Sequence, residues 1–242
     1  MDAAEKSGNY DVMTESLNAD FSKAVVLDTS AMAWQPSPSP TVWRKRLDLV
    51  GGGESGRVTS VVRYDAKASF PVHGHPEGEE ILVLKGIFSD EHGDFPARTY
   101  LLNPPGFRHA PFSRKGCTIF VKLRQYGGER REHVVVETAT AKWAPGPVPG
   151  IDVLPLYRHE RYPETMDLLH VSGGARLSHW ACPGGAEIFV LDGTLVSDDG
   201  DHGAGSWLRL PDGAEWSLGS RGKKGCTLYA KRGHLAAAAP VA

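Results

Sequence analysis

Three histidines and a carboxylate lie close together in the stretch "HGHPEGEEILVLKGIFSDEHGDFPARTYLLNPPGFRHAP", residues 73–111. His73 and His75 are two residues apart, so in an extended strand both side chains point to the same side. Glu79 follows the turn-like "PEG", and His109 follows "NPPG", where Pro-Pro-Gly favours a tight turn before a returning strand. Three imidazoles and a carboxylate that converge in this way can bind one divalent metal ion. The donor set suits Zn or Fe(II), and also Mn, Ni or Cu.

The carboxylate ligand has two candidates, because Glu80 directly follows Glu79. Alternation along a strand directs Glu80 to the opposite face. The second half of the chain also has a glutamate, Glu187, at the matching position, without histidines around it. We therefore expect Glu79 to be the ligand and Glu80 to be structural. A shift of one residue at the "PEG" turn would exchange the two, so both remain candidates.

An internal repeat covers nearly the whole 242-residue chain. "PEGEEILVLKGIFSDEHGD" (76–94) aligns without a gap with "PGGAEIFVLDGTLVSDDGD" (183–201), and "GCTIFVKLR" (116–124) aligns with "GCTLYAKRG" (225–233). A long internal repeat indicates two copies of one structural unit. We predict a polar lead-in at 1–30, a first unit at 31–140 with the metal site, and a second unit at 143–236 without one.

The residue pattern of both units is typical of β-strands and turns. Glycine (28) and proline (17) separate short apolar runs, and no segment has a long helical periodicity. Residues 117–124 alternate, which places two sets of side chains on opposite faces of a strand. One face carries Cys117, Ile119, Val121 and Leu123, and the other carries Thr118, Phe120, Lys122 and Arg124. We therefore predict an all-β fold of two tandem barrels.

The second unit lacks the metal donors. The alignment replaces the four donors, in the order His73, His75, Glu79 and His109, by Trp180, Cys182, Ala186 and Trp216. Two indoles and two small side chains are typical of an apolar interior. We expect the second barrel to be packed where the first barrel binds its ion.

Amino-acid composition indicates which classes of binding partner and which cellular location to expect. Lys and Arg number 27 against 29 Asp and Glu, and the basic clusters are short, so we expect no nucleic acid or membrane partner. Three cysteines are too few for a disulfide framework. Without a signal peptide or a membrane-spanning apolar run, a cytoplasmic location is expected.

The two blocks His73-Gly-His75…Glu79…Gly86 and Pro104-Pro-Gly106…His109 resemble the paired motifs of the cupin superfamily. The surrounding sequence is most similar to the cupin domain of ChrR-type anti-sigma factors and its stand-alone relatives. The resemblance implies two jelly-roll β-barrels, a metal held by His73, His75, Glu79 and His109, and a homodimer. It implies zinc by analogy with ChrR, or ferrous iron by analogy with cupins that cleave diketones. The chain has no Cys-x-x-Cys pair like that of the ChrR zinc domain, so sigma-factor binding is not carried over.

These features leave three hypotheses, the first two of which involve a small-molecule ligand or substrate. The chain is a metal-dependent dioxygenase of a carbonyl or phenolic compound, or it is a zinc-binding regulatory cupin that senses a ligand or oxidant without catalysis. A metal-stabilised barrel with neither role is the third reading.

Overall fold

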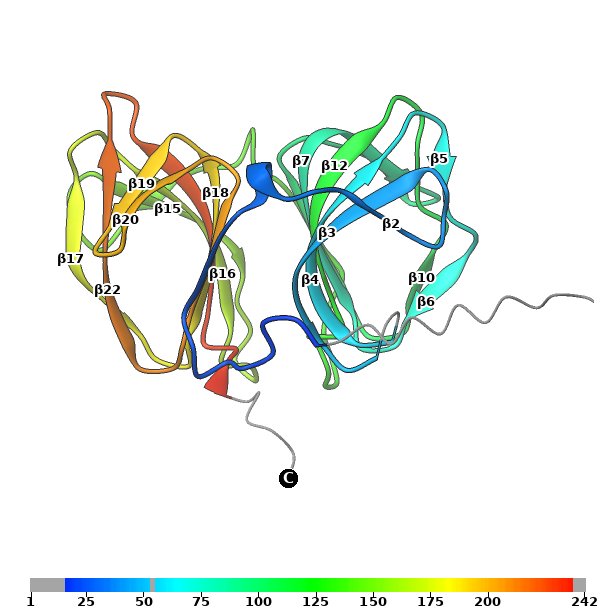
Figure 1. Cartoon of the computed structure of the whole chain (residues 1–242), viewed down its shortest axis with the longest axis horizontal. Helices are drawn as coiled ribbons and strands as arrows, with labels where there is room; N and C mark the ends of the chain where they lie inside the picture. The colour runs from blue at the N-terminus through cyan, green and yellow to red at the C-terminus, as the bar shows by residue number, and fades with distance from the viewer. Residues whose placement is uncertain (1–15, 53–54, 237–242) are drawn as a thin grey trace, which may run out of the picture.

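The computed structural model describes residues 16–52 and 55–236, and its secondary structure is almost entirely β-strand (Figure 1). The helical element in this part of the chain is a single 3-10 turn, η1 (Thr29–Ala31). Two barrels lie side by side, as predicted, so the all-β tandem-barrel fold is confirmed. Within the described ranges, no helix is long and apolar enough to cross a membrane. Residues 1–15 of the expected lead-in and residues 237–242 of the alanine-rich tail lie outside the described residues.

The first barrel consists of a ten-stranded and a two-stranded sheet. The main path of the large sheet runs β13-β9-β7-β12-β4-β3-β2, with β8 and β11 paired to β7 and β5 paired to β11. Its strands are β2 (Gln35–Pro36), β3 (Val42–Val50), β4 (Arg57–Tyr64), β5 (Ala68–Ser69), β7 (Glu79–Asp90), β8 (Gly93–Pro96), β9 (Thr99–Asn103), β11 (Phe112–Ser113), β12 (Cys117–Leu123) and β13 (Val134–Glu137). The small sheet pairs β6 (His73–His75) with β10 (Phe107–His109).

The second barrel has a seven-stranded sheet, in the order β1-β21-β18-β23-β16-β15-β14, and a four-stranded sheet, in the order β17-β22-β19-β20. The strands of the larger sheet are β1 (Val25–Asp28), β14 (Ala144–Pro145), β15 (Ile151–Tyr157), β16 (Thr165–Val171), β18 (Ala186–Asp192), β21 (Ser206–Leu210) and β23 (Cys226–Arg232). Those of the smaller sheet are β17 (Arg176–Cys182), β19 (Thr194–Ser197), β20 (Gly200–Gly203) and β22 (Ala214–Arg221).

The two barrels exchange edge strands. β1 precedes the first barrel in sequence but pairs with β21 of the second barrel, so that Val25 lies opposite Arg209. β13 precedes the second barrel but pairs with β9 of the first, with Val134 opposite Leu102. Both exchanges cover a sheet edge that would otherwise present unpaired backbone groups. Residues 25–28, which we expected to be part of the lead-in, therefore supply an edge strand to the second barrel.

Apolar side chains of the described residues pack in three places: inside each barrel and in the seam between them. The alternation predicted for residues 117–123 is confirmed, since Cys117, Ile119, Val121 and Leu123 all face the first barrel's interior. The alternate residue Phe120 faces the seam, where its ring lies 4.8 Å from that of Phe189. Each large sheet thus buries both of its faces.

Buried charges cross the seam in addition to apolar groups. Lys122 donates to Glu187 at 2.5 Å, and both side chains are fully buried. Glu80 accepts hydrogen bonds from Tyr126 and Tyr229 and lies 3.5 Å from the ammonium of Lys231. Each barrel therefore supplies a glutamate to the other barrel's lysine, and buried ions of this kind require such partners.

Candidate metal centre

The pairing of β6 with β10 brings the three histidines together. In this antiparallel pair His109 lies directly opposite His73, and His75 is two residues further along β6 on the same side. One ligand atom from each of the three rings lies within 4.8 Å of the others. The turns "PEG" and "NPPG" shape this approach, because Gly78 (φ +73°) and Gly106 (φ +84°) both adopt the left-handed conformation that glycine favours.

Nitrogen and oxygen atoms face one another at the centre of the cluster. The Nε2 atoms of His75 and His109 are 3.0 Å apart. Glu79 Oε2 lies 3.5 Å from each of these nitrogens. Because metal–ligand bonds of these donors are about 2.1 Å, ligand atoms around one ion lie about 3–4 Å apart. The spacing and chemistry of these residues therefore fit a divalent ion.

Neighbouring groups hold the side chains of the candidate ligands in place. Asp90 Oδ2 lies 3.1 Å from His109 Nδ1, and the carbonyl of Pro71 lies 3.0 Å from His73 Nδ1. Both contacts suit a ring that carries its proton on Nδ1 and leaves Nε2 free to bind an ion. Asn103 donates from Nδ2 to Glu79 Oε2 at 2.9 Å.

Asp90 and Asn103 were not predicted from the sequence. The repeat holds a signal for both, since the matching residues of the second unit are Ser197 and Leu210. An acidic or amide side chain that occurs only in the unit with the histidines is a candidate for support of the site.

Burial and charge act differently on two of the rings. Burial lowers the pKa of His75, and the nearby Glu79 carboxylate only partly offsets this. Burial also opposes protonation of His109, but the hydrogen bond to Asp90 and the charge of Glu79 outweigh it and raise the pKa of His109. Asp90, despite its burial, has a lowered pKa because His109 hydrogen-bonds to it. An ionised Asp90 opposite a cationic His109 is the arrangement that these directions describe.

A cavity of about 290 Å³ opens next to the cluster, with His73, His75 and Glu79 in its wall. Tyr64 and Phe70 give it an aromatic side, and Arg124 lines it as well. We expected Arg124 on the same face as Lys122, and this was wrong. β12 ends at Leu123, and Arg124 takes a left-handed conformation (φ +58°) that breaks the alternation.

The sequence profile of the ChrR Cupin-like domain matches the chain twice, over residues 22–127 and residues 131–236. This chain belongs to the ChrR Cupin-like family. The two matches make it a bicupin, and each begins just before the strand that is exchanged between the barrels. No curated protein sequence matches the bicupin.

Solved structures share the bicupin's fold at low sequence identity. A proposed dioxygenase from Nostoc punctiforme aligns with a TM-score of 0.69 and 14% identity, covering 86% of the bicupin and 82% of that chain. Ylba from Escherichia coli aligns with a TM-score of 0.65 and 16% identity, covering 93% and 96%. The pirin YhhW from E. coli, solved in complex with nickel(II), aligns with a TM-score of 0.64 and 11% identity, covering 87% and 99%. At these identities the likeness shows the fold alone.

The second cupin barrel is packed at the positions that correspond to the candidate metal ligands. Trp180 lies opposite Trp216 in the pairing of β17 with β22. Both indoles, together with Cys182 and Ala186, are buried in that barrel's core. The histidine cluster identified in the described part of the bicupin is the one in the first barrel.

Proposed function

We propose that the first barrel holds one divalent metal ion through His73, His75, Glu79 and His109. We further propose that the bicupin is a metal-dependent enzyme whose substrate is a small, oxygen-rich molecule. The observation that carries this proposal is that three of the four donors, His73, His75 and Glu79, line a cavity rather than a closed core. Structural metal sites are closed, whereas catalytic sites keep positions open to a substrate. A cavity of about 290 Å³ admits a compound of a few carbon atoms with two oxygen donors.

We infer that the reaction is a dioxygenation of an enolisable carbonyl or phenolic compound. A redox-active ion such as Fe(II) would supply Lewis acidity and O2 chemistry at this position. The Nostoc punctiforme protein of similar fold is itself a proposed dioxygenase, which supports this reaction class.

The chain's own residues have distinct roles in this proposal. The guanidinium of Arg124, in the cavity wall, would orient an enolate or phenolate oxygen. Tyr64 and Phe70, whose rings are 5.8 Å apart, would pack against the apolar part of the substrate and exclude water. Asp90 and Asn103 would hold His109 and Glu79 in position.

An oxygen-electrode screen tests this proposal. The protein, purified with its metal, is offered a panel of β-diketones, 2-oxo acids and catechols, and His109→Ala is the matched variant. We expect O2 consumption with at least one class in the wild type and none in the variant. Equal consumption by both proteins would refute the proposed site.

A regulatory role is the second candidate, and the double match to the ChrR Cupin-like domain favours it. In that case the ion would be zinc, and the cavity would bind a ligand or oxidant without turnover. Bound zinc, together with no O2 consumption across the panel, would select this role over the enzyme.

A further inference from the structure

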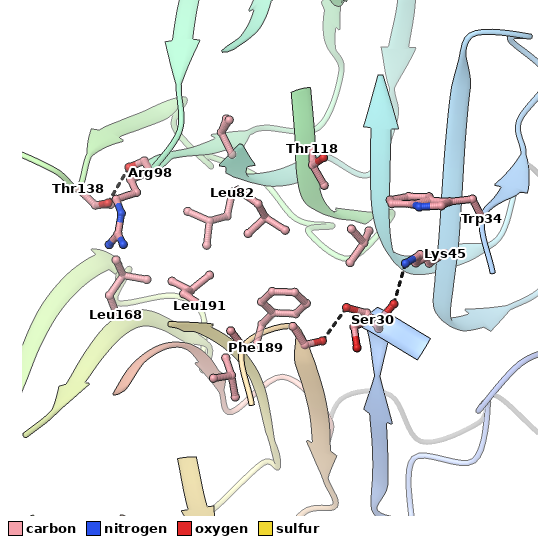
Figure 2. Close-up of a pocket in the computed structure, with 17 residues that line it drawn as sticks. Ser30, Trp34, Lys45, Leu82, Arg98, Thr118, Thr138, Leu168, Phe189 and Leu191 are labelled. Carbon is pink, nitrogen blue, oxygen red and sulfur yellow. Dashed lines mark hydrogen bonds between the residues drawn. The ribbon is translucent and has the colours of Figure 1, made fainter. Parts of the chain in front are cut away.

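A second cavity, of about 350 Å³, lies in the seam between the two barrels and is separate from the metal centre (Figure 2). Val61, Leu82 and Leu84 line it from the first barrel, and Leu168, Phe189 and Leu191 line it from the second. None of the four candidate metal ligands is among its lining residues. Its volume is in the range of sites that bind small organic molecules.

A buried cation lies at one end of this seam cavity. Lys45 is 8% exposed, and its ammonium donates to the carbonyl of Thr29 at 2.7 Å. The same ammonium lies 4.3 Å from the centre of the Trp34 ring, on the ring face. Within residues 16–52 and 55–236, no carboxylate forms an ion pair with Lys45. A buried ammonium is costly without an anionic partner, so this end of the cavity favours an anion.

Charges of both signs act on Lys45, Asp28 as an anion and Arg63 as a cation. Asp28 is on the neighbouring segment, but its carboxylate accepts hydrogen bonds from the backbone and hydroxyl of Ser30. The guanidinium of Arg63 also lies over the Trp34 ring, 4.8 Å from its centre. Burial and the Arg63 charge lower the pKa of Lys45, and the Asp28 charge offsets them only in part, so the balance at this ammonium favours a further anion.

The opposite end of the seam cavity is also basic. Figure 2 shows Arg98 across the cavity from Lys45 and Trp34. The backbone of Arg98 is held there in a left-handed conformation (φ +72°), with its carbonyl accepting from the amide and hydroxyl of Thr138. The lining is therefore an apolar middle with a cation at each end.

From this lining we propose that the seam cavity is a binding site for an amphipathic organic carboxylate. Its carboxylate pairs with Lys45, and its hydrocarbon body lies between the leucines and Phe189 of the two barrels. The site needs both barrels, since each supplies half of its apolar wall. Its ligand would therefore stabilise the association of the two barrels.

Isothermal titration with octanoate tests this site. We expect one octanoate per chain with a dissociation constant below about 1 mM, an ordinary affinity for a ligand of that size. Lys45→Met should weaken binding by about tenfold or more, because a charged hydrogen bond is lost. Lys115→Met, which removes an exposed lysine on the first barrel, is the matched control and should bind as the wild type does. Octanol and octylammonium should bind at least about tenfold more weakly than octanoate.

Two further variants distinguish binding in the seam cavity from binding elsewhere on the protein. Leu191→Trp fills the cavity without changing charge, so it should also abolish octanoate binding; this keeps the test valid if Lys45→Met fails to fold. Octanoate held at the metal centre instead would be lost in His109→Ala and retained in Lys45→Met, which would overturn the proposal. Absence of octanoate binding to the wild type, or equal binding of octanol, would overturn it as well.

Discussion

Glu79 and Glu80 are consecutive residues of β7, yet their carboxylates lie in different cores. Glu79 Oε2 is 3.5 Å from the Nε2 atoms of both His75 and His109 in the first barrel. Glu80 points the other way and accepts a hydrogen bond from Tyr229 of the second barrel at 2.5 Å. Strand alternation therefore divides the pair into a carboxylate that faces the histidines and a carboxylate in the seam. Substitutions at these two positions should have different consequences.

Glu80→Gln should leave the metal content of the protein unchanged but reduce its stability. The change leaves the buried ammonium of Lys231 without its anion, and breaking a buried pair in this way costs about 3–5 kcal/mol. Elemental analysis and urea denaturation measure the two effects. Glu79→Gln is the matched variant and should show the reverse, with lost metal and a smaller change in the free energy of unfolding. Loss of metal in Glu80→Gln alone would show that Glu80 is the ligand.

Asp90→Asn should weaken metal binding without removing a ligand. Its carboxylate orients His109 from 3.1 Å, and loss of such a group typically lowers metal affinity about 10–100-fold. Competition with a chelator of known affinity measures this change. Asp94→Asn is the control. Asp94 lies on the neighbouring strand β8, and its carboxylate forms an exposed ion pair with Arg114, so this change should leave metal affinity unaltered. Equal affinities in the two variants would mean that Asp90 does not support the site.

Trp180→Ala should destabilise the protein by about 3–5 kcal/mol and leave the metal content intact. Trp180 is 7% exposed and belongs to the core that occupies, in the second barrel, the positions of the candidate metal ligands. Chemical denaturation followed by circular dichroism gives the difference. Trp143, which is 37% exposed, is the comparison, and its replacement by Ala should cost less than about 1 kcal/mol. A cost for Trp180→Ala as small as that would mean that its indole does not fill the core.

Acid should destabilise the seam through His234. Burial lowers the pKa of His234 to about 3, and the hydrogen bond to Glu187 only partly offsets this effect. Between pH 6.5 and about 3 the unfolded chain therefore binds a proton that the folded chain does not. The free energy of unfolding should fall by about 1.4 kcal/mol per pH unit in that interval from this group alone.

A comparison with His234→Gln isolates the contribution of His234, because glutamine retains a hydrogen-bond donor but does not titrate. Urea denaturation at several pH values should show the wild type losing more stability than the variant as the pH falls below 6.5. Above pH 6.5 the difference between the two proteins should be constant. Parallel curves at all pH values would contradict the assignment of a buried, neutral His234.

The repeat and the alternation were sufficient to predict the tandem barrels, and they also separated the two faces of β12. Both signals can be read within one unit of the repeat, because each barrel is formed from the same order of strands. The pairing of β1 with the second barrel was not predictable, because edge pairing depends on how two barrels meet rather than on the four residues of that strand, whereas β13 lies within the range 31–140 that we assigned to the first unit. Arg124 was misplaced for a related reason, since alternation fails where a strand ends.

Some residues of the candidate site could be predicted from the sequence, and others could not. The donors His73, His75 and His109 stand out because their types and spacing are unusual in a strand. Asp90 and Asn103 are ordinary polar residues in sequence. Their one sequence signal is that the second unit has Ser197 and Leu210 in their places, and their contacts with His109 and Glu79 reveal the role. The seam cavity had no sequence signal, because its lining residues come from both repeats.

The proposed metal centre binds one ion through the three histidines and Glu79 of the first barrel. Elemental analysis of untagged protein, purified without chelator in air and under nitrogen, tests this centre most directly, with His109→Ala measured in parallel. We predict about one divalent ion per chain in the wild type and none in the variant. Full metal occupancy in His109→Ala, or a wild-type protein that holds no ion under either atmosphere, would contradict the proposed centre.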